Sequence, residues 1–216
     1  MVEAQAKSRN ICRWHRRKED RPAEILAAAL QIFSEKGFAA TKLDEVAKQA
    51  GVSKGTLYLY FESKEALLKE VVNEFVLPHI INAESEAASY SGSIQDLIRK
   101  LVEQMRTQIL ETELCGIPKL IISEATNFPE LAEFYLVNVI QRGRKFIAGL
   151  IQAGIENGEF IQCDTDCVAR SLLSTLVFVA IWQRSLAPFD ENYDLKHYLN
   201  THVEIFLRGI AKDTNA

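Results

Sequence analysis

Residues 41 to 64 read TKLDEVAKQAGVSKGTLYLYFESK, a pattern that predicts two short helices joined by a tight turn. Thr41 and Asp44 have the spacing of a capping box, in which a hydroxyl and a carboxylate bind free amides of a first helical turn. Gly51 tolerates the positive φ of a helix C-terminus, so the first helix should stop there. Between these ends, apolar residues recur at helical spacing: Leu43, Val46, Ala47 and Ala50.

The second helix should begin after Ser53, whose hydroxyl can cap it, and bury Leu57 and Phe61, which lie four residues apart. Its outer face carries side chains suited to phosphates and base edges, with a glycine that leaves room for another backbone: Lys54, Gly55, Thr56, Tyr58 and Tyr60. The pattern therefore predicts a DNA-reading helix-turn-helix. The alternative is an ordinary amphipathic helix pair whose polar face is merely solvated.

The candidate DNA-binding residues divide by chemistry. We expect phosphate contacts from Thr41, Tyr58, Tyr60 and Lys64. Base edges should come within reach of Lys54, Gly55 and Thr56, next to the capping residue Ser53, while Lys42 suits either role.

These residues resemble the DNA-binding signature of the TetR family of bacterial transcriptional regulators, T-x-x-x-[IV]-A-x-x-A-G-V-S-x-G-T-L-Y-x-[YH]-F-x-[ST]-K-[ED]. The resemblance extends back over residues 23–37 but does not itself cover the C-terminal two-thirds. A longer basic leader and Glu62, an acid near the expected phosphates, depart from the family pattern. The matching positions are Thr41, Val46, Ala47, Ala50, Gly51, Val52, Ser53, Gly55, Thr56, Leu57, Tyr58, Tyr60, Phe61, Ser63, Lys64 and Glu65.

Charge is unevenly spread along the 216 residues. The chain has a net charge of -4, with 48% hydrophobic and 25% charged residues, which is typical of a soluble globular protein. Residues 1–21 nevertheless hold seven Lys and Arg against three acids. A basic end on an acidic body fits a DNA-binding end joined to a body that avoids DNA. The leader should add affinity by reaching flanking phosphates or the minor groove, unless it is a solubilising tail.

Helical spacing continues to the end of the chain, and no alternating strand pattern interrupts it. We expect an all-α fold of about nine helices, with breaks at Gly37, Pro78 and residues 91–93, and caps at Ser93 and at Asp164 or Thr165. The expected domains are a basic flexible leader (1–21), a helix-turn-helix domain (22–66) and a C-terminal domain (67–216), which begins on a linking helix over 64–77.

The resemblance implies a homodimer formed by the two C-terminal helices. The penultimate helix is apolar nearly all round and should be buried on every side. The sequence leaves two sources of that burial open, a second copy or the chain's own core. The bulky residues available are Phe178, Trp182, Leu186, Tyr198, Val203, Phe206 and Ile210.

The resemblance also implies a small-molecule effector in a cavity of the larger domain. Few charged groups should point inward, which favours an apolar or aromatic effector of modest size. Bulky residues at helical spacing more often form ordinary hydrophobic core, and that alternative stays open. The candidate ligand-binding residues are Phe75, His79, Met105, Ile109, Ile122, Phe128, Tyr135, Phe146, Phe178 and Trp182.

Other classes of function lack their sequence features. The chain has no glycine-rich phosphate loop, nucleophile elbow or His-Glu-x-x-His, so we expect no enzyme, no catalytic residue and no cofactor. Cys163 and Cys167, with His197 and His202, fit zinc spacing poorly, and no metal site is expected. No secretory signal is found, and the longest apolar run, 176–182, is too short to span a bilayer, which indicates a cytoplasmic protein without a membrane partner.

Two hypotheses follow. The first is a ligand-responsive repressor that binds a pseudo-palindromic, double-stranded operator as a homodimer and leaves it when an effector binds. The alternative is a helical protein-interaction module that uses its helix-turn-helix to dock on another protein.

Overall fold

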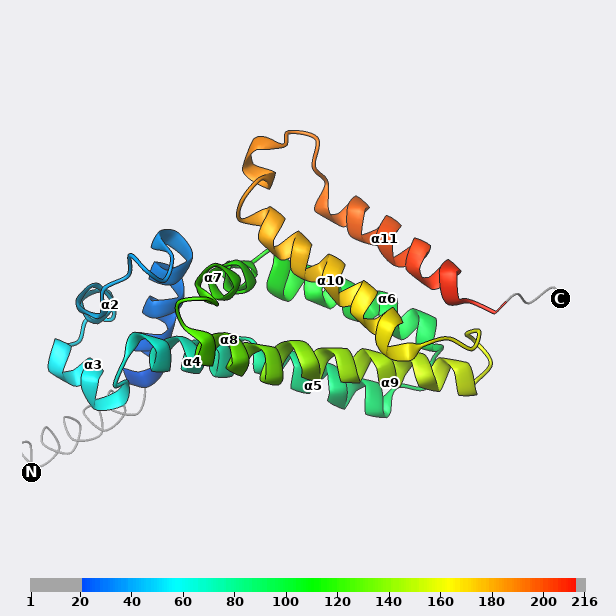
Figure 1. Cartoon of the computed structure of the whole chain (residues 1–216), viewed down its shortest axis with the longest axis horizontal. Helices are drawn as coiled ribbons and strands as arrows, with labels where there is room; N and C mark the ends of the chain where they lie inside the picture. The colour runs from blue at the N-terminus through cyan, green and yellow to red at the C-terminus, as the bar shows by residue number, and fades with distance from the viewer. Residues whose placement is uncertain (1–20, 213–216) are drawn as a thin grey trace, which may run out of the picture. The chain divides into compact units, whose positions relative to one another are not determined.

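The structure is a computed structural model that describes residues 21–212 (Figure 1). It forms two compact units, of which one ends at Val71 and the other begins at Val72. Residues 21–212 contain helices, turns and a single bridge between Phe160 and Ala211, but no strand. The predicted all-α fold is therefore confirmed. The predicted leader, residues 1–21, lies outside the described part except for Arg21, which begins the first helix.

The first unit is a small helical head. It consists of a helix over residues 21–36, α2 (Leu43–Gln49), α3 (Lys54–Tyr60) and the first two turns of α4 (Lys64–Phe75). Its core is formed by fully buried apolar side chains, one or more from each helix: Ile25, Ala29, Val46, Leu57, Leu67 and Leu68. Burying a single leucine such as Leu57 contributes about 1.5–3 kcal/mol. This burial fixes which face of α3 remains outside.

The turn chemistry of the head agrees with the sequence at three of four positions. Gly37 and Gly51 have φ of 79° and 66°, and the Ser53 hydroxyl accepts a hydrogen bond from the Thr56 amide. The predicted Thr41 cap is wrong, because α2 has Lys42 at its N-cap and no side-chain cap bond. The buried Thr41 hydroxyl instead donates to the Gly37 carbonyl over 2.7 Å, since a buried hydroxyl needs a partner and this carbonyl ends the preceding helix.

Proline interrupts the helix that leaves the head. α4 ends at Phe75 and α5 (Leu77–Ser89) begins two residues later, with Pro78 in its first turn. Proline is tolerated there because the first amides of a helix have no intrahelical partner. The predicted break at Pro78 is confirmed.

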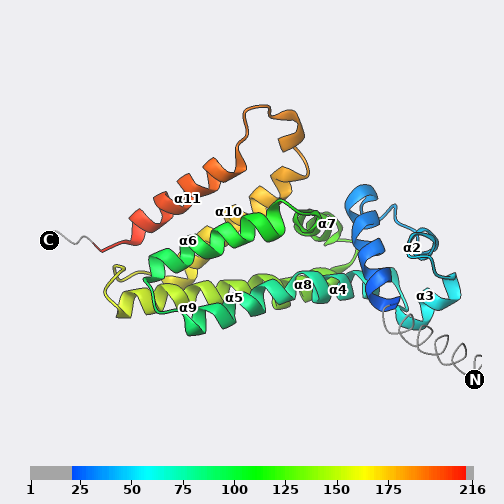
Figure 2. The same cartoon turned by 180° about the vertical axis from the view of Figure 1, so that it is seen from behind.

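The second unit continues with α6 (Ile94–Met105), which runs into the π-helical η1 (Arg106–Leu110), and then with η2 (Glu113–Cys115) and α7 (Gly116–Glu124). A continuous helix follows, formed by α8 (Pro129–Tyr135), η3 (Leu136–Gln141) and α9 (Arg142–Glu156). The chain ends with α10 (Thr165–Gln183), η4 (Ala187–Phe189) and α11 (Leu195–Ile210). α10 packs along α9, and α11 packs on α6 (Figures 1 and 2).

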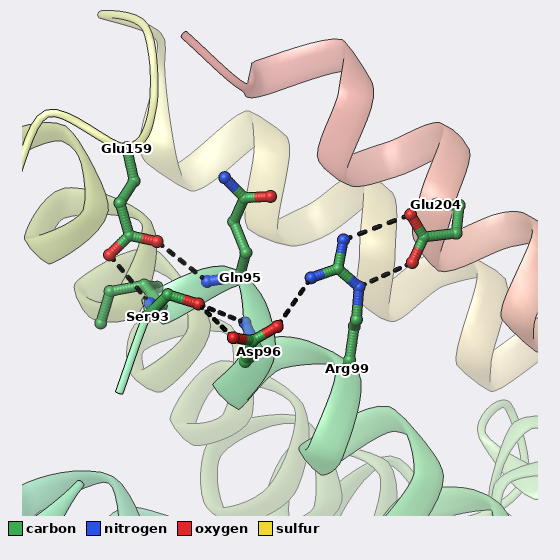
Figure 3. A network of polar contacts seen from close by, with 7 residues as sticks. Ser93, Gln95, Asp96, Arg99, Glu159 and Glu204 are labelled. Atoms are coloured by element: carbon green, nitrogen blue, oxygen red, sulfur yellow. Dashed lines mark hydrogen bonds and ion pairs between the residues drawn. The ribbon is translucent and has the colours of Figure 1, made fainter. Parts of the chain in front are cut away.

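Polar contacts fix α6 at its N-terminus (Figure 3). The Ser93 hydroxyl caps the helix, and the Glu159 carboxylate accepts two amides of its first turn over 2.9 and 3.2 Å. Arg99 donates two hydrogen bonds to Glu204 on α11, over 2.6 and 3.2 Å. Because such forked pairs are directional, α11 is held against α6 in one register. These contacts hold the frame around the cavities described below.

α10 is not buried on every side within one chain. Ala169, Leu172 and Val179 are buried, whereas the side chain of Phe178 is 56% exposed. The chain's own core therefore does not bury α10 on every side, and burial of its remaining face by a second copy stays a prediction. By length and composition alone, α10 also resembles a membrane-spanning helix, with a mean hydropathy of 1.4. The absence of a membrane partner remains a prediction.

Candidate DNA-reading helix and effector cavity

The outer face of α3 is formed as its sequence pattern requires. Leu57 points into the core with no exposed surface, while Tyr58 and Tyr60 are 46% and 36% exposed. Lys54 and Gly55, at the N-terminal end, are exposed as well. The helix therefore exposes a cation, a bare backbone and two phenols around its buried Leu57.

Lys54 is paired within the head. Its ammonium lies 2.8 Å from Asp44 of α2, and both side chains are about three-fifths exposed. The hydrogen bond that Lys54 donates to Asp44 raises the pKa of Lys54 above its usual value. An exposed ion pair of this kind is screened by solvent and salt, so Lys54 can exchange Asp44 for another anion.

Ser53, Gly55 and Thr56 lie together at the start of α3. The Ser53 and Thr56 hydroxyls are 2.8 Å apart, and Ser53 also caps the helix. A Cβ at Gly55 would meet the Ser53 hydroxyl at an ordinary contact distance of 3.9 Å. The head itself therefore does not require a glycine at this position.

Thr41 and Lys64 form hydrogen bonds within the head. The Lys64 ammonium donates to the carbonyls of Phe38, Ala39 and Thr41 over 2.6, 3.2 and 3.2 Å. An ammonium has three donors, and all three are engaged. Lys64 also lies 4.5 Å from the centre of the Phe38 ring. These contacts hold the loop before α2.

One exposed residue of α3 was missing from the expected set. Leu59 is 83% exposed and lies between Tyr58 and Tyr60. An apolar side chain on an otherwise polar helix face is visible in the sequence and could have been noticed. Lys42, at the N-cap of α2, is exposed and remains available to either kind of contact.

Two apolar cavities lie inside the second unit, with volumes of about 140 and 130 Å³. We call them the first and second inner cavities. Their walls come from α5, α6, η1, α9 and α10, and the second also touches α7 and the α8–η3 segment. No Asp, Glu, Lys or Arg lines either cavity. The residues that line both are His79, Ile80, Met105, Ile109, Gly143, Leu173 and Leu176.

Few polar atoms interrupt these walls. His79 Nδ1 and the Gln108 Oε1 atom are 3.0 Å apart at the edge of the first inner cavity. Tyr135 lines the second inner cavity, and burial raises the pKa of its phenol, which therefore stays neutral. The inner cavities suit an apolar ligand body with one or two hydrogen-bonding groups.

A larger space lies nearer the surface between α7, the α8–η3–α9 helix and α10. We call it the outer groove; its volume is about 630 Å³. Three exposed apolar side chains contribute to it, Ile122, Leu136 and Phe178. Tyr135 lines both the outer groove and the second inner cavity.

The expected ligand-binding residues are divided among these spaces. His79, Met105 and Ile109 line both inner cavities, Phe146 the first and Tyr135 the second. Ile122 and Phe178 line the outer groove instead.

Phe75, Phe128 and Trp182 line none of the three spaces. Val76, the residue between α4 and α5, lines the second inner cavity in place of Phe75, because the chain leaves the α4 helix at this point. Phe128 is the N-cap of α8. The Trp182 ring packs against Phe178 and Tyr193, with centroids 5.9 and 6.2 Å away.

Sequence reasoning also missed Gly143 and Leu173. A glycine within α9 leaves space where a side chain would stand, and a Cβ there would be 4.0 Å from Leu173. Nothing in the local sequence marks either residue, because their importance comes from packing between α9 and α10. Within residues 21–212, no group of three His, Cys, Asp or Glu is placed to hold a metal ion.

Comparisons with known proteins agree with this geometry. Residues 25–71 match the family "Bacterial regulatory proteins, tetR family", and residues 96–209 match "AefR-like transcriptional repressor, C-terminal domain". The chain is 26% identical to the fatty acid metabolism regulator protein of Bacillus subtilis over 198 residues, which cover 89% of this chain and 98% of that protein. It is 27% identical over 202 residues to the transcriptional repressor KstR2 of Rhodococcus jostii, covering 92% and 95%.

Solved structures share the fold. A TetR-family regulator of Mesorhizobium loti superposes with a TM-score of 0.72 at 26% identity, over 91% of this chain and 99% of that one. The two family matches together span the DNA-reading head and most of the cavity-bearing unit. The chain therefore belongs to the TetR family of bacterial transcriptional regulators.

Proposed function

We propose that the protein is a ligand-responsive repressor that binds a two-fold symmetric operator in the cytoplasm as a homodimer. Residues 22–66 form the proposed DNA-binding domain and residues 67–216 the proposed effector-binding and dimerisation domain. The observation that carries this proposal is the outer face of α3, where Lys54, Gly55, Tyr58 and Tyr60 are exposed around a buried Leu57. A face of this composition suits the major groove and its flanking phosphates.

Contacts to DNA divide along this helix. Lys54, Gly55 and Thr56 face base edges, while Tyr58 and Tyr60 reach the sugar-phosphate backbone. Leu59 adds an apolar surface that fits the methyl group of a thymine. Lys64 and Thr41 support the head from within and leave the direct contacts to these residues.

The leader supplies the long-range electrostatic attraction to DNA. Residues 21–71 hold seven Lys and Arg and seven Asp and Glu, so the head by itself is neutral. Residues 1–20 add six further Lys and Arg against three acids. Because sequence-independent DNA affinity comes mainly from cations near phosphates, deletion of residues 1–20 should lower both the affinity and its salt dependence. Unchanged affinity at low salt would identify the leader as a solubilising tail.

The homodimer forms through α10 and α11. Large apolar side chains stand exposed on or beside these helices and outside the outer groove: Leu186, Phe189, Tyr198 and Ile205. An apolar surface of this kind commonly marks an interface, and a two-fold pair would bury the same residues on both copies. Recognition helices in such a dimer enter grooves roughly 34 to 36 Å apart, or a multiple of this.

Effector binding releases the operator by a shift between two conformations. α4 crosses the boundary between the two units, and α5, after the break at Pro78, lines the inner cavities with His79 and Ile80. An effector that fits the cavities better when α5 is displaced favours a conformation with the wrong spacing between reading heads. An effector with equal affinity for both conformations would leave the equilibrium between them unchanged. The apolar walls, and a relative named for fatty acid metabolism, favour an apolar effector.

DNA fragments from the region upstream of the protein's own gene provide the first test. Fluorescence anisotropy should detect one fragment bound far more tightly than a scrambled fragment of equal length, at several salt concentrations. Footprints should be two-fold symmetric. An absence of DNA binding even at low salt would reject the repressor and leave the protein-interaction module.

The dimer is tested by Ile205→Lys, which places a charge on the exposed face of α11. Sedimentation should detect monomers for this variant and dimers for the wild type. Ile161→Lys is the matched control, because Ile161 is also exposed but lies outside both helices. A wild-type chain that is monomeric at operator-binding concentrations would contradict the homodimer.

The effector is tested by a thermal-shift screen of apolar and aromatic metabolites, followed by an assay of operator release for each stabilising compound. A coupling of about 1 to 3 kcal/mol is typical, or roughly 5- to 150-fold in operator affinity. If every stabilising compound left DNA affinity unchanged, the regulatory role of the cavity would be rejected while DNA binding would stand.

A further inference from the structure

The outer groove is polarised along α10. At one end it is lined by Gln141, Arg144, Arg170 and Ser174, and at the other by α7 residues and Ile181. Arg170 and Ile181 are eleven positions apart on one helix, which corresponds to about 16 Å. The groove therefore has a cationic end and an apolar end.

The cationic end has an excess of positive charge. Arg144 and Arg170 share one carboxylate, that of Asp166, at 3.0 and 3.9 Å. Arg170 is the looser partner, with a side chain that is 62% exposed. Each guanidinium has five N–H donors in a planar fork that matches carboxylate and phosphate oxygens. Two arginines and one acid leave donors and net charge available for an anion.

The groove and the inner cavities behind it share lining residues. Leu173 lines the outer groove and both inner cavities. Tyr135, Ile140 and Val177 line the groove and the second inner cavity. These four residues form a boundary that we call the neck. Leu173 and Val177 are only partly buried, so rotamer changes of these two side chains can widen the neck.

We propose that the effector site runs from the inner cavities through the neck into the outer groove, and that the effector is an amphipathic anion. Its apolar chain occupies the inner cavities, and its oxyanion head, a carboxylate or a phosphate ester, binds Arg144 and Arg170. This inference rests on the proposed function and names the ligand class of the same site. The sequence favoured an apolar or aromatic effector because few charged groups were expected to point inward. The inner walls carry no charge, and Arg144 and Arg170 lie beyond the neck in the outer groove.

The geometry favours this occupant over a second copy of the chain. A protein surface would need only the exposed apolar side chains, whereas the paired arginines and the continuity with apolar cavities complement a molecule with one charged end and one apolar end. The charge at the groove also explains how a chain-like ligand would take one orientation, with its tail toward His79 on α5.

Three probes of equal chain length test the head group: dodecanoate, dodecyl phosphate and dodecan-1-ol, used below their micelle concentrations with the full-length protein. Calorimetry should give a dissociation constant at least about tenfold lower for one of the anions than for the alcohol. The two anions distinguish a carboxylate from a phosphate head. Equal affinity for anions and alcohol, or no binding of any probe, would overturn the proposal.

Variants test where the ligand's charged group binds and whether the ligand passes through the neck. Arg170→Gln should weaken the bound anion about tenfold and leave dodecan-1-ol unchanged, while Lys145→Gln, which removes a neighbouring exposed cation outside the groove, should change neither. Leu173→Trp should block entry of all three probes, whereas Leu173→Ala should retain them. Unchanged anion affinity in Arg170→Gln would overturn the assignment of the ligand's charged group to the two arginines.

Three further measurements separate the possible failures. Sedimentation of Arg170→Gln should still detect dimers; dissociation into monomers would show that the groove belongs to the contact between copies and would overturn the proposal. Thermal unfolding of Leu173→Trp should remain cooperative, with Leu173→Ala as the reference if it does not. Operator binding without ligand tests the repressor function separately, so failure of the anion site leaves that function intact.

Discussion

The Lys64 ammonium at the start of α4 donates a hydrogen bond of 2.6 Å to the Phe38 carbonyl, which lies in the loop before α2. With its bonds to Ala39 and Thr41, this lysine closes the loop that positions the first helix of the DNA-reading pair. A residue expected on DNA is thus occupied in holding the DNA-reading head together.

Lys64→Ala should lower the stability of the head. Loss of the cation leaves three carbonyls without their charged donor, and hydrogen bonds to charged groups contribute about 1.5 to 3 kcal/mol. Thermal unfolding should shift downward by several degrees, whereas Lys48→Ala, an exposed cation at the end of α2, should leave it in place. An unchanged melting temperature, with a salt slope of DNA binding reduced by about one unit, would instead return Lys64 to a direct phosphate contact.

Gly55→Ala should separate folding from DNA binding. The added methyl group meets only an ordinary contact at 3.9 Å, and alanine favours a helix, so the melting temperature should stay equal or rise. Operator affinity should fall by about tenfold or more, because the methyl group keeps DNA away from the backbone. Gly149→Ala on α9, where a Cβ meets no atom within 4 Å, is the matched control: its melting temperature should likewise stay equal or rise, and its operator affinity should not change. Full affinity in Gly55→Ala would show that DNA does not approach this backbone.

Lys54 should contribute to sequence preference. Anisotropy with a panel of single-base operator variants should show that Lys54→Ala loses discrimination at particular base pairs, by about 1 to 3 kcal/mol each. Asp44→Asn removes the partner that lies 2.8 Å away and should raise affinity at low salt, because the lysine is released and an acid near the phosphates is lost. A uniform loss of affinity across all sequences in Lys54→Ala would place Lys54 among the residues that contact phosphates.

Gly143→Leu should fill the inner cavities. The side chain would project beside Leu173 into space shared by both cavities, so apolar effectors should no longer stabilise the protein or release the operator. DNA binding without effector should be retained, and the unliganded melting temperature should not fall. Gly143→Ala is the control, since its methyl group occupies little of the space. An effector response that survives Gly143→Leu would place the regulatory site elsewhere.

The sequence by itself determined the local structure of the reading head. Helical spacing, Gly37, Gly51 and the cap at Ser53 specify elements within a few residues of each other, and the matched motif specified the family. Helix ends at Pro78, Ser93 and Asp164 followed from the same local chemistry. These features depend on backbone conformations and hydrogen bonds that neighbouring residues settle among themselves.

The tertiary structure decided which of the polar and bulky side chains are free. Lys64 and Thr41 carry the residue types of phosphate contacts, but their hydrogen-bonding partners come from a loop more than twenty residues before Lys64. The cavity walls depend on Gly143 and Leu173, which meet across α9 and α10, and no local pattern encodes that encounter. Cavities and long-range hydrogen bonds arise from how helices distant in sequence pack together, so composition and spacing along one helix leave them undetermined.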